Sequence, residues 1–262
     1  MKCPICEAKT ERAFITTILS RYEAEYRHCR HCGYLFAADP HWLNEAYTDA
    51  ISSTDTGLVK RNISISSKVA CLLYFCAKER GKGRYLDVAG GYGMLTRMMR
   101  DFGFDFFWQD KYCANLLAKG FEFNRADGEC LAVTAFEVLE HVTNPIDFIK
   151  LSLDDAGAST LIFSTILYKG EPPDPREWWY YTFSTGQHIG FFQKRTLEII
   201  GQKLGLRLST AKDIHVLSKT KFSYSFMKIL TRDIVSRLIC FWIMFRLNGK
   251  AESDRETLLA RQ

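Results

Sequence analysis

The stretch "YLDVAGGYGM", Tyr85 to Met94, decides the fold: an apolar run ends in an acid, and three glycines follow within four residues. The run "RYLDVA" is typical of a buried strand, and "MLTRMMRDFGF", directly after the glycines, is typical of a helix that ends near Gly103. Small residues between a strand and a helix let the main chain approach a ligand closely, and the first amides of the helix are free to bind it. The stretch therefore predicts a cofactor loop that begins at Asp87.

The same alternation of strand and helix continues along the chain. Further strands are predicted over "FDFFWQD", "CLAVTAF" and "STLIFSTIL". Helices are predicted over "NPIDFIKLSL", with Asn144 as N-cap and Pro145 in the first turn, and over "KRTLEIIGQKLGL", ending at Gly205. This order predicts an α/β domain in which helices cover both faces of a parallel sheet.

The loop favours S-adenosylmethionine over a dinucleotide. Asp110 closes the next predicted strand, 23 residues after Asp87, where a carboxylate can accept both hydroxyls of an adenosine ribose. The dinucleotide fingerprint G-x-G-x-x-G, counted from Gly91 and Gly93, would need a third glycine where Thr96 stands. An acid followed by closely spaced glycines suits the amino acid end of S-adenosylmethionine, which brings no pyrophosphate.

The segments "LDVAGGYGMLTR", "WQDKY" and "TAFEVLEHVTNP" resemble three motifs of class I S-adenosylmethionine-dependent methyltransferases. The resemblance covers about residues 83–212 and is greatest to the bacterial subgroup that reads "VLEHV" after the fourth strand. It implies a doubly wound, Rossmann-like, mostly parallel sheet of seven strands. It also implies six cofactor-binding residues, with Ala89 where a glycine is usual: Asp87, Ala89, Gly91, Gly93, Asp110 and Phe136.

Two cysteine pairs near the N-terminus predict a zinc site. "CPIC" and "RHCRHC" contain C-x2-C pairs separated by 22 residues. Each pair can aim two thiolates at one centre, and four thiolates complete the tetrahedron that zinc prefers. Because no position stays open for substrate, we expect structural zinc held by Cys3, Cys6, Cys29 and Cys32 in a zinc-ribbon-like segment.

His188 is the first candidate for catalysis. A cysteine-rich region ahead of a methyltransferase core resembles the sugar C-methyltransferases of deoxysugar pathways, which carry a late Tyr-x-Glu-His stretch. Here "FSTGQHIGFF" has Thr185 and Gln187 in place of the tyrosine and the glutamate, so that only His188 carries over, as base or substrate-binding group. The alternative is a partly buried structural histidine.

Glu137 and His141 are the second candidates, because they follow the fourth strand, where this fold opens toward its substrate. With Glu140 they could orient the substrate, act as base or bind a divalent cation, as O-methyltransferases with a similar "EVLEH" imply. A salt bridge or helix cap is the alternative for Glu140. Two nearby segments are interpreted as site borders: the aromatic loop "PPDPREWWYY" at 172–181, and "DTGLVKRN" at 55–62 as a lid or a linker.

Composition and charge leave several partners open. The 262 residues are 47% hydrophobic and 25% charged, the nine cysteines are odd in number, and no long apolar run is present, so we expect a cytoplasmic globular protein without signal peptide or spanning helix. Residues 194–262 carry 14 Lys and Arg against 6 Asp and Glu. This basic tail could attract nucleic acid, anionic lipid or a phosphorylated substrate, or be a solvated face. The apolar segment 234–247 predicts an interfacial helix or, more simply, packing on the core or on a second subunit.

These observations predict four parts, at 1–38 (zinc ribbon), 39–82 (helical lid or linker), 83–218 (cofactor-binding domain) and 219–262 (basic helical extension). The function predicted is methyl transfer from S-adenosylmethionine to oxygen or carbon of a small molecule, in particular a sugar or saccharide precursor such as a sugar nucleotide. The alternatives are an RNA methyltransferase and a non-catalytic cofactor-binding protein. The oligomeric state stays open.

Overall fold

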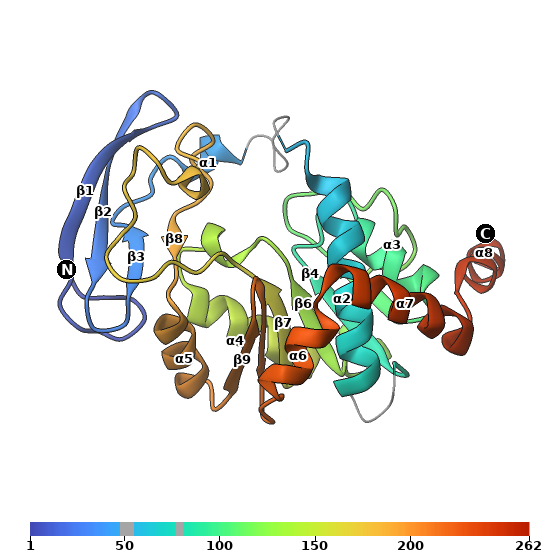
Figure 1. The fold of residues 1–262 in the computed structure, drawn as a ribbon. Coiled ribbons are helices and arrows are strands. Elements are labelled where there is room, and N and C mark those ends of the chain that lie inside the picture. The colour runs from blue at the N-terminus through green and yellow to red at the C-terminus, as the bar shows by residue number, and fades with distance from the viewer. Residues whose placement is uncertain (48–54, 77–80, 262) are drawn as a thin grey trace.

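The computed structural model describes residues 1–47, 55–76 and 81–261, and Figure 1 shows two sheets arranged side by side. Positions 48–54 and 77–80 of the predicted lid or linker lie outside the described residues. The smaller, N-terminal sheet has the order β1-β2-β3-β8, and the larger sheet has the order β5-β4-β6-β7-β10-β9. The strands are β1 Glu11–Ile18, β2 Tyr22–Cys29, β3 Tyr34–Ala37, β4 Arg84–Val88, β5 Asp105–Gln109, β6 Ala132–Ala135, β7 Thr160–Ser164, β8 Gly190–Phe191, β9 Arg207–Ala211 and β10 Ile214–Ser218.

Helices cover both faces of the larger sheet. On one face, α4 and α5 bury Ile149 and Leu197 against Leu86 of β4. On the other face, α2 and α3 pack against Tyr85, the neighbour of Leu86, because successive side chains of a strand point to opposite faces. The helices are α1 Leu43–Ala46, α2 Leu58–Cys76, α3 Met94–Asp101, α4 Pro145–Ala156, α5 Lys194–Lys203, α6 Tyr224–Leu230, α7 Asp233–Leu247 and α8 Ala251–Leu259, with short 3-10 turns η1 Arg125–Asp127, η2 Leu139–His141 and η3 Trp179–Tyr181.

Most elements of the core lie where the sequence predicts them. The doubly wound, mostly parallel α/β sheet is confirmed: β5, β4, β6 and β7 are parallel, and β10 is antiparallel to both of its neighbours. Asn144 caps α4 as predicted, since its side chain accepts the amide of Asp147. The helix α5 ends at Lys203, two residues before Gly205.

The predicted count of seven strands is wrong for the described chain, in which this sheet has six strands. The outer neighbour of β5 is reduced to one isolated parallel bridge between Trp108 and Glu122. The amide of Phe123 donates to the carbonyl of Trp108, and the amide of Trp108 donates to the carbonyl of Phe121. The segment therefore takes the place of an edge strand without reaching the length of one.

The N-terminal sheet also includes part of the core sequence. Its fourth strand, β8, comes from residues 190–191 and pairs with β3 through Leu35–Phe191 and Phe36–Gly190. The predicted boundary at residue 38 is therefore crossed by main-chain hydrogen bonds, for example from Ala37 to the carbonyl of Ile189 at 2.9 Å. The division into four parts stays a prediction.

Candidate functional site

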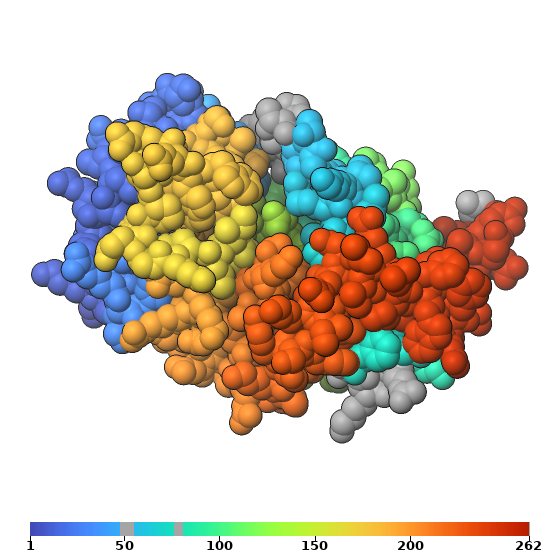
Figure 2. Space-filling view, viewed as in Figure 1, coloured from blue at the N-terminus to red at the C-terminus, as the bar shows by residue number. Residues whose placement is uncertain are grey.

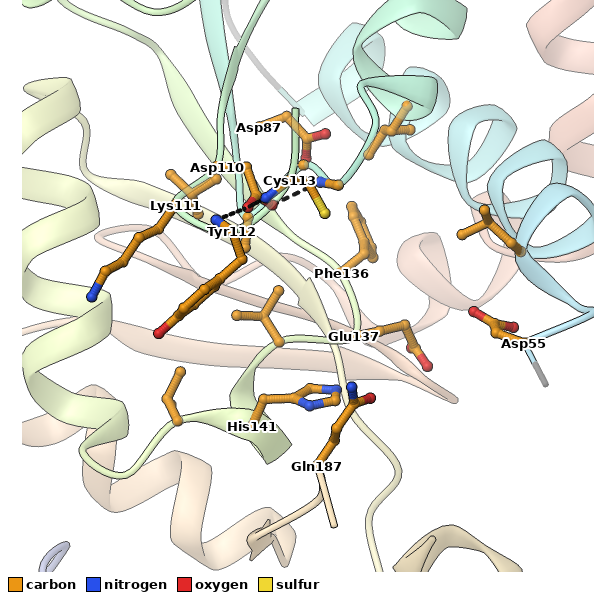
Figure 3. Close-up of a pocket in the computed structure, with 18 of the residues that line it drawn as sticks. Asp55, Asp87, Asp110, Lys111, Tyr112, Cys113, Phe136, Glu137, His141 and Gln187 are labelled. Carbon is orange, nitrogen blue, oxygen red and sulfur yellow. Dashed lines mark hydrogen bonds between the residues drawn. The ribbon is translucent and has the colours of Figure 1, made fainter. Parts of the chain in front are cut away.

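The main cleft opens at the carboxyl ends of β4, β5 and β6. In the order β5-β4-β6, the chain passes from β4 to β5 on one side and then crosses to β6 on the other side of β4. Open α/β sheets bind ligands at such a switch point. The cleft has a volume of about 1230 Å³, enough for a nucleoside cofactor and a small acceptor together. Figure 3 shows its lining: Asp87 and Asp110 on one side, Glu137, His141 and Gln187 on the other, and Phe136 between them.

The loop after β4 has a tight backbone. Ala89, Gly91 and Gly93 all have positive φ, of 52°, 55° and 85°. This conformation suits glycine and strains alanine. Ala89, which stands where the family usually has glycine, is therefore in a strained backbone conformation. Ala89 and Gly91 line the cleft. Gly93 lies behind the loop and starts α3, where an added Cβ would approach Asn115 Oδ1 to 2.8 Å.

Asp87 is a buried carboxyl group at the floor of the cleft. Its Oδ1 accepts a hydrogen bond of 2.6 Å from the hydroxyl of Thr134 on β6, and its Oδ2 accepts a long one of 3.5 Å from Thr96 on α3. Burial raises the pKa of Asp87 to about 7, and the nearby charge of Asp110 contributes to the rise. This group thus holds a proton much more readily than an exposed aspartate and would release that proton to solvent when a cationic ligand binds beside it.

Asp110 organises the loops around the cofactor end of the cleft. Its Oδ2 accepts the amide of Gly91 at 2.9 Å, and its Oδ1 accepts the amides of Tyr112 and Cys113 at 2.7 and 2.8 Å (Figure 3). Each carboxylate oxygen has further lone-pair capacity. Asp110 can therefore hold the two loops together and still accept ribose hydroxyls.

Glu137 begins the acceptor side of the cleft in a strained conformation, with φ of 56°. Ser164, at the end of β7, holds it twice: the amide of Glu137 donates to the serine hydroxyl at 3.0 Å, and that hydroxyl donates to Oε1 of Glu137 at 2.6 Å. Backbone strain of this kind persists only where the surroundings impose it, which is common at binding sites. Ser164 was not predicted as a site residue.

His188 and His141 meet at the far wall, with ring centroids 4.7 Å apart. His188 Nδ1 lies 2.7 Å from the carbonyl oxygen of Tyr180. Because a carbonyl can only accept, Nδ1 carries the proton and Nε2 keeps a lone pair. Burial lowers the pKa of His188 to about 4; burial, with the neighbouring imidazole, lowers that of His141 to about 3, so both rings are neutral near pH 7.

Tyr180 and Glu140 lie beside these histidines. The Tyr180 ring is 4.6 Å from the His188 ring, and its hydroxyl donates to Oε1 of Glu140 at 2.7 Å. Burial, followed by the charge of Glu137, raises the pKa of Glu140 to about 8. A tyrosine and a glutamate are the residue types that the stretch around His188 lacks, and the fold supplies both from elsewhere in the chain.

The same corner has a donor set for a divalent cation. Glu140, His141 and His188 each offer one ligand atom, and these atoms lie within 4.8 Å of one another. Among the described residues, Oε2 of Glu140 and Nδ1 of His141 are buried without a hydrogen-bond partner. A carboxylate with two imidazoles suits transition metals such as zinc or iron more than magnesium.

The loops around the entrance differ in role. In the aromatic loop, Tyr181 is buried, whereas the Trp179 side chain lines the cleft and is 71% exposed. The segment 55–62 also lines the cleft, and an ion pair of 2.5 Å joins Asp55 to Arg61.

Two further tyrosines that line the cleft, Tyr47 and Tyr112, were not predicted; their ring centroids are 5.1 Å apart in a stacked arrangement. The signal for Tyr112 was its place two residues after Asp110; Tyr47 gave no signal in sequence.

The four N-terminal cysteines converge as predicted, at a place separate from the cleft. The sulfur atoms of Cys3 and Cys32 are 3.6 Å apart, those of Cys6 and Cys29 are 3.4 Å apart, and all four lie within 4.8 Å. A tetrahedral zinc site with Zn–S bonds of about 2.3 Å would space its sulfurs by about 3.8 Å. The amide of Ile5 also points at Cys3 Sγ, at 3.4 Å. The cluster therefore fits a closed tetrathiolate metal site.

Comparisons with known proteins agree with this geometry. The methyltransferase-domain family matches residues 64–211. No curated protein matches the chain. Among solved structures, the chain is similar to TnmH (14% identity, TM-score 0.48, covering 70% of this chain and 62% of that one). It is also similar to CalO1, a methyltransferase in calicheamicin biosynthesis, in its S-adenosylhomocysteine-bound form (15% identity, TM-score 0.44, covering 68% of this chain and 61% of that one). A third similar structure is human N-acetylserotonin methyltransferase in complex with S-adenosylmethionine (12% identity, TM-score 0.42, covering 69% of this chain and 66% of that one). The chain thus spans less than two thirds of the length of TnmH and of CalO1.

Proposed function

We propose that this chain, which belongs to the methyltransferase-domain family, transfers a methyl group from S-adenosylmethionine to a small, hydroxyl-rich acceptor. When bound, the cofactor supplies an electrophilic methyl group on a sulfonium. The residues of the cleft fit it: two carboxyl groups, Asp87 and Asp110, suit its cationic centres and ribose hydroxyls, and Phe136 offers an apolar wall. The sites named above are assigned as part of this proposal.

The neutral imidazole of His188 carries the proposal. Its protonated Nδ1 is held by the carbonyl of Tyr180, so the opposite nitrogen is a base with a fixed orientation in the cleft. In the proposed reaction Nε2 would accept the proton of an acceptor hydroxyl whose oxygen takes the methyl group; the methyl carbon–sulfur bond would break, and S-adenosylhomocysteine would leave as a neutral thioether. His141 and Glu137 line the same wall and orient the acceptor. Transfer to oxygen is favoured over transfer to carbon because a carbon acid needs a stronger base than this imidazole.

The charge of the cleft supports a saccharide or saccharide precursor more than RNA. Its described lining holds five carboxyl groups against two cations, Arg61 and Lys111. A polyanionic backbone would be repelled there, whereas sugar hydroxyls can donate to carboxylates. The exposed ring of Trp179 at the entrance offers a flat apolar face for a sugar ring. A sugar nucleotide, which carries far fewer charges than RNA, is the first acceptor to test.

Zinc at the cysteine cluster is the second part of the proposal. Four thiolates leave no open position, so zinc there would stabilise the N-terminal sheet and take no part in methyl transfer. The cation site at Glu140, His141 and His188 is an alternative use of the catalytic corner. It predicts that added divalent metal stimulates the purified enzyme and that a His188→Ala variant is no longer stimulated.

The test is methyl transfer from labelled S-adenosylmethionine to a cell extract separated into small-molecule, RNA and protein fractions, with sugar nucleotides as a defined arm. We expect label in the small-molecule fraction and loss of that label with His188→Gln, a matched variant that cannot act as the base. Binding of S-adenosylhomocysteine, measured by calorimetry, should persist in the variant. Label in RNA, lost on treatment with ribonuclease, would contradict the proposed acceptor but not the enzyme class.

A further inference from the structure

The outer face of α7 carries a continuous apolar stripe. The side chains of Ile234, Leu238, Phe241 and Phe245 are 76%, 70%, 63% and 71% exposed. Their spacing of four, three and four residues places them on one side of a helix with 3.6 residues per turn. The opposite side of α7 is buried against α2 through Cys240 and Ile243. The predicted packing of this helix on the core is therefore confirmed, but it accounts for only half of its apolar residues.

The stripe continues onto neighbouring helices. Exposed residues of α6, namely Tyr224, Phe226 and Ile229, extend it toward the start of α7, and Trp242 and Met244 widen it. Figure 2 shows α6 and α7, coloured orange to red, as a continuous part of the molecular surface. Monomeric soluble proteins rarely expose contiguous apolar patches of this extent, and such patches mark binding surfaces.

Cations surround the apolar stripe, and two of them, Lys228 and Arg246, lie over the rings of Tyr224 and Trp242. Arg237 and Arg246 lie on opposite flanks of α7, as follows from a turn of about 100° per residue. Six exposed cations occur on and around this face: Lys219, Lys221, Lys228, Arg232, Arg237 and Arg246. Within the described parts of the chain none of them is in an ion pair. The acid of the region, Asp233, is already paired with Lys68 at 3.0 Å.

The occupant can be chosen from length and charge. With 15 residues, α7 is about 22 Å long, shorter than the hydrocarbon core of a bilayer. In the described chain, each helix is too short or too polar to span a membrane. A second copy seated on this face would bring two sets of unpaired cations together. Nucleic acid would leave the aromatic and aliphatic side chains exposed.

We propose that the outer face of α6 and α7 binds the surface of an anionic phospholipid bilayer. The apolar stripe enters the interface, the flanking lysines and arginines meet lipid phosphates, and Trp242 and Tyr224 lie at the headgroup level. The helix α7 lies in the plane of the membrane, anchored from behind by α2. This proposal does not rest on the acceptor proposed above, because no residue of this face lines the cleft.

Vesicle flotation tests the proposal with the full-length, metal-loaded protein. Vesicles of phosphatidylcholine with about 30 mol% phosphatidylglycerol should bind at least about tenfold more protein than pure phosphatidylcholine, because each cation near an anionic surface favours binding. The Leu238→Glu/Phe245→Glu variant should lose more than about tenfold in partition coefficient, since tenfold is about 1.4 kcal/mol and both side chains are large and apolar. Ile15→Glu, which changes an apolar residue of β1 that is 48% exposed and lies outside α6 and α7, is the control and should bind normally.

Two further measurements keep the test decisive. If the double variant misfolds, quenching of Trp242 by brominated phosphatidylglycerol in the wild type, lost in Trp242→Phe, supports the proposal on its own. Arg237→Gln/Arg246→Gln should weaken binding to the anionic vesicles alone. Equal binding to both vesicle types, absence of binding, or a dimer in solution that the double glutamate variant dissociates would each overturn it.

Discussion

Ala89 has a backbone conformation that suits glycine better than alanine. It holds a φ of 52° in the cofactor loop, where alanine has a steric cost that glycine lacks. Ala89→Gly should raise the stability of the protein by about 0.5–1 kcal/mol, or about 1–4 °C in Tm. Differential scanning fluorimetry measures this. The control is Gly205→Ala, also at positive φ and with nothing near its missing Cβ, which should lower Tm. A lower Tm for Ala89→Gly would show that Ala89 makes a compensating contact.

Asp87 should couple proton release to cofactor binding. Its pKa of about 7 means that part of the cofactor-free protein is protonated there near pH 6.5. A cationic ligand favours the ionised form, so binding of S-adenosylmethionine should release protons and tighten as the pH rises through about 7. Calorimetry in buffers of different ionisation enthalpy measures the released protons. Asp87→Asn should bind without release at the same pH, and unchanged release would assign the proton to another group.

Asp87 also links pH to the stability of the cofactor-free protein. Its folded-state pKa is raised from 3.8 to about 7, so the folded state holds a proton that the unfolded chain releases. The contribution to stability is fully present below about pH 3.8 and is lost as the pH rises to about 7. Urea unfolding at several pH values should show this slope in the wild type and a smaller one in Asp87→Asn.

His188 should act as base over a wide pH range. Replacement by alanine should lower kcat by about 10²–10⁴, the usual worth of general base catalysis. Because the pKa of His188 is about 4, kcat measured with saturating S-adenosylmethionine, which keeps Asp87 ionised, should stay level on the acid side until the pH approaches that value, and then fall as the ring gains a proton. A decline centred near 6.5 would mean that the imidazole is solvated. An unchanged rate in the variant would remove His188 from the mechanism.

At the scale of elements, a buried ion pair attaches α8 to α3. Arg100 donates to Asp254 through two nitrogens, at 2.8 and 2.6 Å, and both side chains are almost fully buried. Asp254→Asn should lower the free energy of unfolding by about 1–3 kcal/mol, because the buried Arg100 loses the charge of one carboxylate partner while Asp105 stays 2.9 Å from its Nη1. Urea denaturation measures this. Asp101→Asn, which removes an exposed partner of Arg97, should cost at most about 0.5 kcal/mol.

Elements differ in how far the sequence predicts them, for physical reasons. The helix α4 has an N-cap, a proline and an amphipathic pattern within 12 residues, and local information of this kind is sufficient. The edge beside β5 depends on tertiary contacts: residues 121–123 form a single bridge there, and the sequence pattern indicated no strand at these positions. The two-residue strand β8 exists only because β3 offers a free edge 150 residues earlier in the chain.

The same division applies to the candidate site. The strand–loop–helix repeat sets the spacing of Asp87, Gly91 and Asp110, and this repeat can be recognised from the sequence alone. Tyr180 and Glu140 meet beside His188 because two distant loops fold together, and nothing in their spacing of 40 residues announces it. The sequence could therefore predict the cofactor end of the cleft in more detail than the acceptor end.

At the scale of the whole molecule, the cysteine cluster and His188, the proposed base, are joined through one sheet. Cys29 closes β2, β3 follows it, and β8 begins two residues after His188. The hydroxyl of Tyr26 on β2 also donates to the carbonyl of His188 at 3.2 Å. Chelation of the proposed zinc should therefore lower kcat more than it lowers cofactor affinity. Activity and S-adenosylhomocysteine binding, measured after dialysis against a chelator and after zinc is restored, check this. Equal loss of both would indicate global unfolding.

The pairing of β8 with β3 also has a consequence for synthesis on the ribosome. The first 37 residues emerge early, but the strand that completes their sheet follows only after about 150 further residues have been made. Until then the free side of β3 is a template on which other chains could pair. We expect nascent chains that stall before Gly190 to need chaperone protection, which full-length chains can do without.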